Sequence, residues 1–186
     1  MKKLIVLAAA ICLMYQMAPA SWQTGTEARL GITVSPEGMI PTGDFHNTNN
    51  VGVGGVVTAD YRLMPSVALT ATTGYLWFHG DKNTVNGITF KNNNINAVPV
   101  VGGLRYYALP NLYVGGELGI HRFMNIPVRN ALGVIIGDKS KNQFSASPMV
   151  GFEQNYGNWG VDVNAGYTWT SDFHYVGARL GLKFGM

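Results

Sequence analysis

The stretch that decides the fold is VPVVGGLRYYALPNLYVGGELGI, residues 98–120. Apolar and polar residues alternate with a period of two on both sides of the turn Leu109-Pro110-Asn111. This pattern indicates two antiparallel strands joined by a short turn. Residues of one parity are apolar in both strands, whereas the other parity carries Arg105, Glu117 and several glycines. The segment is therefore predicted to be a hairpin with one apolar face and one polar face.

The hairpin is one of three similar hairpins in the chain. The first runs from Val53 to Tyr75 and the third from Val150 to Tyr167. A unit that recurs at a near-constant period of about 45 residues is the signature of a repeated supersecondary structure. One further strand on each side, near 28–34 and 176–184, brings the total to eight. The sequence thus predicts an all-β fold of eight antiparallel strands in up-and-down order.

The first twenty residues have the features of a secretory signal peptide. Two lysines precede an apolar stretch, Leu4–Tyr15, and Ala18-Pro19-Ala20 is a small-residue cleavage site. These three features in this order predict cleavage between Ala20 and Ser21. We therefore expect a signal peptide at 1–20 and a single β-barrel domain at 21–186. An apolar core helix at the N-terminus is the alternative.

Composition excludes several functional classes. The 186 residues are 47% hydrophobic and 12% charged, with a net charge of +3, which rules out an intrinsically disordered chain. No run of basic residues exceeds two, so the sequence gives no support for a nucleic-acid partner. The single cysteine, Cys12, lies in the predicted signal peptide, so thiol chemistry in the mature protein is excluded.

The apolar parity could face either way. In a soluble, lipocalin-like barrel it would face inward, and in a membrane barrel it faces outward to lipid. Small residues crowd the polar parity, as a narrow eight-stranded interior requires, and the strands are about ten residues long. Aromatic residues also concentrate at the strand ends, which is typical of the two girdles of a membrane barrel. These are Tyr75, Trp77, Tyr167 and Trp169 at one end, and Tyr61, Tyr106, Tyr113 and Trp159 at the other. We therefore predict an eight-stranded transmembrane β-barrel.

The connections between strands alternate in length. Short turns are expected near residues 64–66, 109–111 and 157–158, and long loops at 36–50, 80–94 and 124–143. Short periplasmic turns and long external loops are typical of membrane barrels. Pro99 and Pro148 fall inside predicted strands, so we expect bulges or an early strand end there. The apolar run within 131–136 predicts an extra hairpin above the membrane or a folded-in loop.

Two further segments carry a family resemblance. Residues 38–45, followed by 51–55, resemble the first-loop region of small outer-membrane barrel proteins. The C-terminal strand resembles their assembly signal, with Val176, Ala178, Leu180, Leu182 and Phe184 on one face. The whole predicted mature chain is similar to the eight-stranded OmpA/OmpX-like superfamily, although it ends in Met186 and not in an aromatic residue. The resemblance implies an integral outer-membrane protein that is inserted by the outer-membrane assembly machinery and contacts outer-membrane lipid and lipopolysaccharide.

The polar parity supplies the candidate functional residues of the interior. The polar parity carries five acidic side chains and five Lys or Arg side chains, and we expect them to form an ion-paired network that plugs the barrel, because unpaired charges there would be costly. A small, low-conductance pore is the alternative. The predicted members are Glu27, Arg29, Asp60, Arg62, Arg105, Glu117, His121, Glu153, Asp162, Arg179 and Lys183.

Catalysis has weaker support in the sequence. Ser171, Asp172 and His174 lie close together on one loop, and His79 and Asp81 on another, but such pairs are common in polar loops. A metal site built from His46, His79 and Asp44 has only loop spacing behind it. We expect no cofactor, no metal and no enzyme activity, with a lipid-modifying enzyme as the third reading. The expected function is structural, or an adhesion-like surface interaction through loops 36–50, 80–94 and 124–143.

Overall fold

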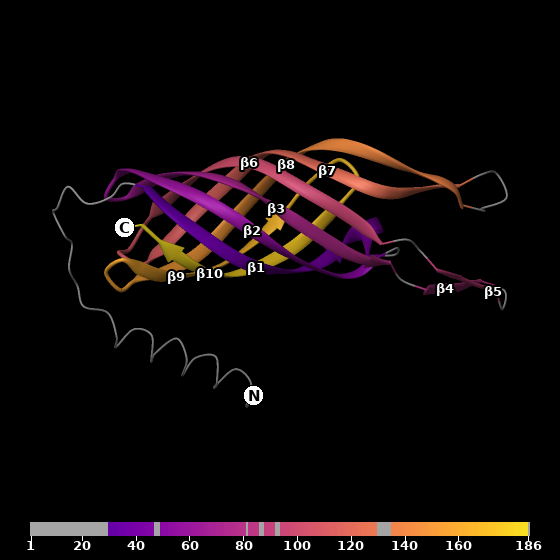
Figure 1. The fold of residues 1–186 in the computed structure, drawn as a ribbon, viewed down its shortest axis with the longest axis horizontal. Coiled ribbons are helices and arrows are strands. Elements are labelled where there is room, and N and C mark those ends of the chain that lie inside the picture. The colour runs from indigo at the N-terminus through magenta and orange to yellow at the C-terminus, as the bar shows by residue number, and fades with distance from the viewer. Residues whose placement is uncertain are drawn as a thin grey trace, which may run out of the picture.

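The computed structural model describes residues 30–46, 49–80, 82–85, 88–91, 94–129 and 135–185. Within these residues, eight antiparallel strands close into a barrel (Figure 1). The barrel strands are β1 (Leu30–Thr42), β2 (Asn49–Met64), β3 (Val67–Gly80), β6 (Ile95–Tyr107), β7 (Leu112–Arg129), β8 (Ile135–Asn155), β9 (Trp159–Thr168) and β10 (His174–Phe184). The predicted signal peptide, its cleavage site at Ala20 and Ser21, and residues Glu27 and Arg29 lie outside the described residues.

The strands follow one another around the wall in the order β1-β10-β9-β8-β7-β6-β3-β2. Each barrel strand pairs with the barrel strands that come before and after it in the chain, and β1 pairs with β10 to close the barrel. The predicted up-and-down topology is therefore confirmed. The turns at 65–66, 108–111 and 156–158 lie at one end, here called the short-turn end. At the opposite, long-loop end lie the 3₁₀ turn η1 (Gly43–Phe45) and a hairpin of β4 (Lys82–Val85) and β5 (Ile88–Lys91).

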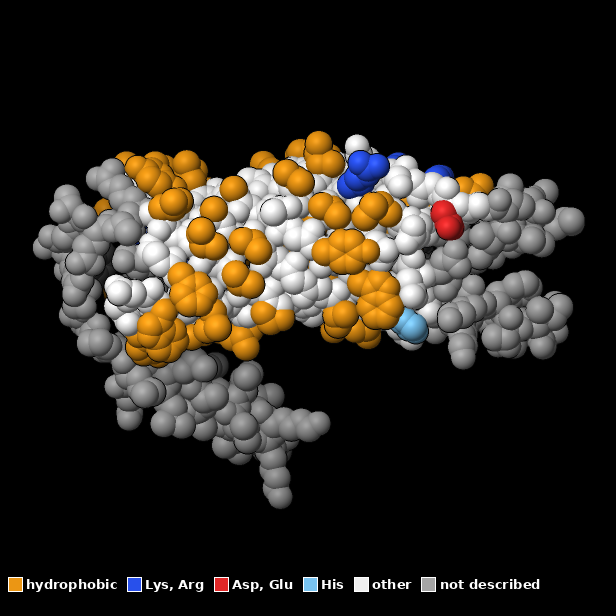
Figure 2. All heavy atoms as spheres, in the orientation of Figure 1, with side chains coloured by type: hydrophobic (Ala, Val, Ile, Leu, Met, Phe, Trp, Pro, Cys, Tyr) orange, Lys and Arg blue, Asp and Glu red, His pale blue; other side chains and the backbone are white. Residues whose placement is uncertain are grey.

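The outside of the wall is apolar. Along β1, buried and exposed residues alternate strictly, and the exposed ones include Leu30, Ile32 and Val34. Large side chains such as Phe144 and Val100 are 64% and 63% exposed. On the face shown in Figure 2, hydrophobic side chains are spread along the barrel, whereas charged and histidine side chains gather toward the long-loop end. This polarity is the inverse of a soluble protein and matches a barrel surrounded by lipid.

The aromatic girdle needs one correction. Tyr61, Tyr106 and Trp159 are exposed toward the short-turn end, and Tyr75, Trp77 and Trp169 toward the long-loop end, while Tyr167 is half-buried and shares a 3.0 Å hydrogen bond with Thr42. Tyr113, however, is fully buried inside the barrel. It has the parity of Glu117 and not of the outward-facing Val114, so its assignment to the girdle was wrong. Among the described residues, no helix is long and apolar enough to cross a membrane.

The predicted loops are shorter than expected at two places. Strand β1 continues to Thr42, so the first half of the predicted loop 36–50 is wall. Strands β7 and β8 reach Arg129 and Ile135, so most of the predicted loop 124–143 is a paired extension of the barrel. A register shift between Phe123 and Ile126, with Asn125 at φ 61°, marks a bulge where this extension leaves the wall.

The prolines interrupt pairing without shifting it. The β3–β6 ladder skips Pro99 and Val98 and resumes in the same register, and the β8–β9 ladder ends at Met149, with an isolated bridge from Ala146 to Trp169 beyond Pro148. The expected bulges and early strand ends are therefore wrong: β6 and β8 continue through their prolines. Proline cannot donate a ladder hydrogen bond, so Pro99 leaves a gap in the β3–β6 ladder and Pro148 one in the β8–β9 ladder.

Candidate functional site

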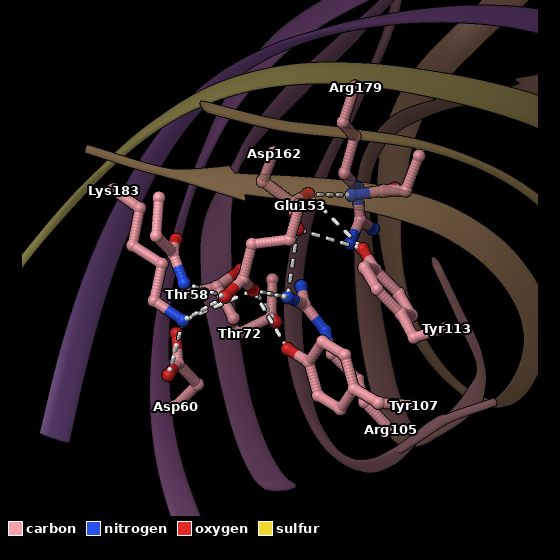
Figure 3. Close-up of polar contacts among 12 residues, drawn as sticks. Thr58, Asp60, Thr72, Arg105, Tyr107, Tyr113, Glu153, Asp162, Arg179 and Lys183 are labelled. Atoms are coloured by element: carbon pink, nitrogen blue, oxygen red, sulfur yellow. Dashed lines mark hydrogen bonds and ion pairs between the residues drawn. The ribbon is translucent and has the colours of Figure 1, made fainter. Parts of the chain in front are cut away.

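The short-turn half of the barrel interior holds an ion-paired network centred on Glu153 (Figure 3). One carboxylate oxygen lies 3.1 Å from Arg62 Nη2 and 3.1 Å from Lys183 Nζ. The other accepts a 2.8 Å hydrogen bond from Tyr107 and lies 3.8 Å from Arg105 Nη1. Three strands, β2, β6 and β10, thus direct four polar groups at one carboxylate of β8, which links the walls of the barrel across its interior.

Asp162 is the second centre of this network. It lies 3.0 Å from Arg105 Nη1 and accepts hydrogen bonds from Tyr113 and Asn164. The guanidinium of Arg105 also stacks over the Tyr113 ring at 4.5 Å. A buried cation needs carboxylate partners of this kind because desolvation of an unpaired charge costs several kcal/mol.

Lys183 joins the two sides of the network. Its ammonium group lies between Glu153 and Asp60, 2.9 Å from the latter. We call the set Asp60, Arg62, Arg105, Glu153, Asp162 and Lys183 the lower cluster. Its three carboxylates and three cations balance in charge.

A smaller group, the middle cluster, consists of Glu37, Glu117 and Arg179. Arg179 Nε lies 3.1 Å from Glu37 Oε2, and its Nη1 donates a 3.1 Å hydrogen bond to Glu117 Oε2. Thr72 donates a 2.7 Å hydrogen bond to the other oxygen of Glu117. Glu37 lies within the predicted loop 36–50, but the structure places it in β1. The alternation that continues through Glu37 and Met39 is the signal that could have found it.

Aromatic side chains fill the long-loop half of the interior. Phe45 and Phe173, from two loops, pack against each other with centroids 4.9 Å apart, and they contact Phe78 and Phe123 at 5.0 and 4.4 Å. We call this set, with Tyr175, the aromatic cap. Other buried apolar residues surround it: Met39, Val56, Leu76, Ile95 and Ala97. Sequence reasoning missed the cap, although consecutive apolar residues from Tyr75 to Phe78 indicate that both faces of β3 are apolar at this end.

His121 lies at the boundary between the aromatic cap and the polar interior. Its Nδ1 is 2.8 Å from the Ser145 hydroxyl, and its Nε2 is 3.0 Å from the Tyr175 hydroxyl. The ring stacks with Phe123 at 6.0 Å. Both ring nitrogens therefore have hydroxyl partners, and the imidazole links the cap to the wall.

The loop after β9 is fastened to the rim of the barrel. Asp172 accepts hydrogen bonds of 2.5 Å from Lys141 and from Gln143, and its backbone N–H donates to the Gln143 side chain. Thr170 bonds to both the N–H and the C=O of Phe173, which holds that ring over the interior. These contacts position one of the two loop residues of the aromatic cap.

A match over almost the whole chain identifies the family of this protein. Residues 4–185 match the model of the outer membrane protein beta-barrel domain. The chain belongs to this family. The match and the outward apolar wall agree on an outer-membrane location, and the closed interior described above is the interior of an outer-membrane barrel. No curated protein matches the sequence closely enough to count as a relative.

Solved structures share the fold of this outer-membrane barrel at low identity. Neisserial surface protein A is 11% identical, with a TM-score of 0.60, and covers 87% of this chain and 100% of its own. The attachment invasion locus protein Ail of Yersinia pestis, solved with the heparin analogue sucrose octasulfate, is 14% identical, with a TM-score of 0.59 and coverages of 86% and 99%. AlkL, solved in lipid bilayers, is 12% identical, with a TM-score of 0.55 and coverages of 90% and 94%.

The loop residues proposed for catalysis or metal binding are dispersed in the barrel. His79 packs edge-on against Trp77 at 5.6 Å, and His46 is exposed in the turn after η1. Asp172 is held by Lys141 and Gln143, while His174 pairs with Thr42 in the wall. Asp81 lies outside the described residues, within which no three metal-ligating side chains come together.

The Asp172 contacts predict a measurable titration. The hydrogen bond from Lys141 and its charge, together with Gln143, hold the pKa of the Asp172 carboxyl below its ordinary value of 3.8. The contacts of Asp172 with Lys141 and Gln143 are therefore intact at neutral pH and are lost only as the pH falls through that lowered pKa. We expect the Asp172 amide signal in NMR spectra to titrate below pH 3.8 and the Lys141→Met variant to titrate closer to it. An unchanged titration in that variant would contradict the assignment. Because the pair is exposed, its loss should cost at most about 1 kcal/mol.

Proposed function

We propose that this protein is a surface-interaction protein, in which a closed barrel anchors extended loops at the outside of the cell. The observation that supports it best is the packed interior: two ion-paired clusters and the aromatic cap fill the barrel between its ends. The cavity beside Arg179 has a volume of about 10 Å³, which holds about one water molecule. An eight-stranded barrel is narrow enough for side chains to close it.

The long-loop end supplies the contact surface in this proposal. Strands β7 and β8 have 18 and 21 residues, and their paired extension projects past the barrel rim (Figure 1). Its described part exposes Asp138, Lys139, Lys141 and Asn142. External loops on a rigid scaffold are where such proteins carry binding residues. The fold shared with Ail, which was solved with a sulfated heparin analogue, suggests a sulfated polysaccharide as the first probe.

Cells that display the protein provide the test. We expect them to bind immobilised heparin, and we expect a variant in which a tight turn replaces 126–139 to fall to the background of cells without the protein. A variant that shortens the β4–β5 hairpin is the matched control for loop removal. A heat-dependent gel shift of each variant checks that the barrel is folded. Equal binding by the shortened β7–β8 variant would contradict the proposal.

The packed interior also predicts electrical behaviour. Purified protein in planar bilayers should show no steady conductance at neutral pH, because paired charges and aromatic rings occupy the described part of the narrow interior. Single-channel currents in the wild type would instead favour a small pore. Arg105→Met separates the two readings, since it should destabilise a plug but increase the current through a pore.

A further inference from the structure

The charges of the described barrel interior do not balance. The lower cluster is neutral, whereas the middle cluster has two carboxylates, Glu37 and Glu117, against the single guanidinium of Arg179. All three lie in the interior, Glu37 and Glu117 with side chains 2% exposed and Arg179 10%. An uncompensated negative charge in such a setting is costly and is normally neutralised by a proton or a counter-ion.

The two carboxylates differ in how well they are bound. Glu117 accepts hydrogen bonds from Arg179 and from Thr72. Glu37 Oε2 is in an ion pair with Arg179 Nε at 3.1 Å but accepts no hydrogen bond, although Glu37 is only 4% exposed. A buried carboxylate oxygen without a hydrogen bond is a rare and expensive feature. Asp60 Oδ1 also lacks a hydrogen bond, but Asp60 is matched by Lys183 in the neutral lower cluster, so the excess negative charge is placed at Glu37.

A small cavity lies beside Glu37. Its lining includes Glu37 and Arg179 together with the polar side chains of Ser147, Asn164 and Thr168. Ser147 donates a 2.9 Å hydrogen bond to Thr168, and Asn164 donates its amide N–H to Asp162, so the Ser147 and Asn164 side-chain oxygen atoms are not the acceptors in these bonds. The cavity volume of about 10 Å³ suits one small species. Oxygen ligands of this kind are those that hard cations prefer.

We propose that the middle cluster binds one small monovalent cation, a proton or Na⁺, at Glu37 and the adjoining cavity. The added charge neutralises the second carboxylate. Arg179 does not repel it strongly enough to prevent binding, because both carboxylates already surround the guanidinium. This inference concerns the barrel interior and does not depend on the surface function proposed above.

The other ionisable groups around Glu37 are accounted for. Arg179 and Tyr175 face it from β10, and Glu117 and His121 belong to β7. Asp60 on β2 is paired with Lys183, Glu153 on β8 belongs to the balanced lower cluster, and so does Asp162 on β9. His121 is the alternative position at which an extra positive charge could be bound. Its two nitrogens, however, already contact hydroxyl groups on the aromatic side of the cluster.

Urea unfolding of the purified barrel in detergent micelles tests the proposal. A cation bound only by the folded barrel stabilises it by mass action, so the urea midpoint falls as that cation becomes scarce. For a proton, the wild-type midpoint falls as the pH rises from about 5 to about 9. For Na⁺, it falls when choline replaces Na⁺ at constant ionic strength. Glu37→Gln should abolish whichever dependence is present and be at least as stable as the wild type at high pH.

Three variants make the outcome decisive. Asp172→Asn, the same change of charge at an exposed carboxylate, should keep the wild-type dependence. A dependence that survives in Glu37→Gln, or is lost only in His121→Gln, would overturn the assignment to Glu37. Failure of Glu37→Gln to fold would also overturn it, since Arg179 would then require that charge.

In the wild type itself, carbon NMR of labelled glutamate should show one glutamate carboxyl that responds to pH above about 5 or to Na⁺. A spectrum without such a response would contradict the proposal independently of any variant.

Discussion

Glu153→Gln is expected to lower the free energy of unfolding of the barrel by about 3–5 kcal/mol. The change keeps the shape of the side chain but removes the charge that faces Arg62, Arg105 and Lys183. Asp60 and Asp162 remain, so the lower cluster is left with one buried cation in excess. Urea-induced unfolding in detergent micelles, followed by tryptophan fluorescence, measures the loss.

Two further variants show that the uncompensated charge is the cause. Lys139→Met removes an exposed charge on β8, the strand of Glu153, and should change the unfolding free energy by no more than about 0.5 kcal/mol. The double variant Glu153→Gln/Lys183→Met restores the charge balance and should regain part of the loss. If the double variant is as unstable as the sum of the single changes, the charges act independently and the network is misassigned.

Phe123→Ala is expected to destabilise the barrel by about 3–5 kcal/mol. Its ring is fully buried, packs against Phe173 at 4.4 Å and stacks with His121. Truncation leaves a cavity that the rigid wall cannot close. The loop that carries Phe173 should then lose its anchor, and protease cleavage near that loop reports this local effect alongside the urea midpoint.

The outside of the barrel offers a matched control for this truncation. Phe144 has the same side chain on the neighbouring strand β8, but it points outward and is 64% exposed. Detergent or lipid fills the space that Phe144→Ala vacates, so its cost should be well below that of Phe123→Ala. Equal losses for the two variants would show that the cap contributes no more than the wall surface.

Period-two alternation was sufficient to predict the wall of the barrel. It identified the strands, their number and their outward face, because lipid on one side and a narrow polar interior on the other impose opposite chemistry on alternate residues. It failed where that contrast vanishes. At the long-loop end, Leu76 and Phe78 face inward beside the outward Tyr75 and Trp77, so both parities are apolar and alternation no longer separates the two faces.

The remaining wrong predictions concern features that tertiary contacts determine. The predicted loop 36–50 begins at Pro36, yet β1 continues through this residue, which pairs with Gly55 of β2. Tyr113 was assigned to the girdle by its residue type, whereas its hydroxyl group bonds to Asp162 from a different hairpin. The pairing of particular charges, such as Arg179 with both Glu37 and Glu117, depends on the stagger of strands around the barrel. No local pattern contains that information.

The seam between β1 and β10 has a consequence for how the barrel forms. Every other barrel pair joins neighbours in the chain, so its loop-closure entropy is small, whereas the seam joins the two ends of the described wall. Its ladder skips Ser35 and Pro36, and the first pair beyond the gap is Glu37 with Arg179. The barrel pair with the largest loop-closure cost thus contains an ion pair next to the missing backbone bonds. Closing the ring of strands therefore also brings these two charges together.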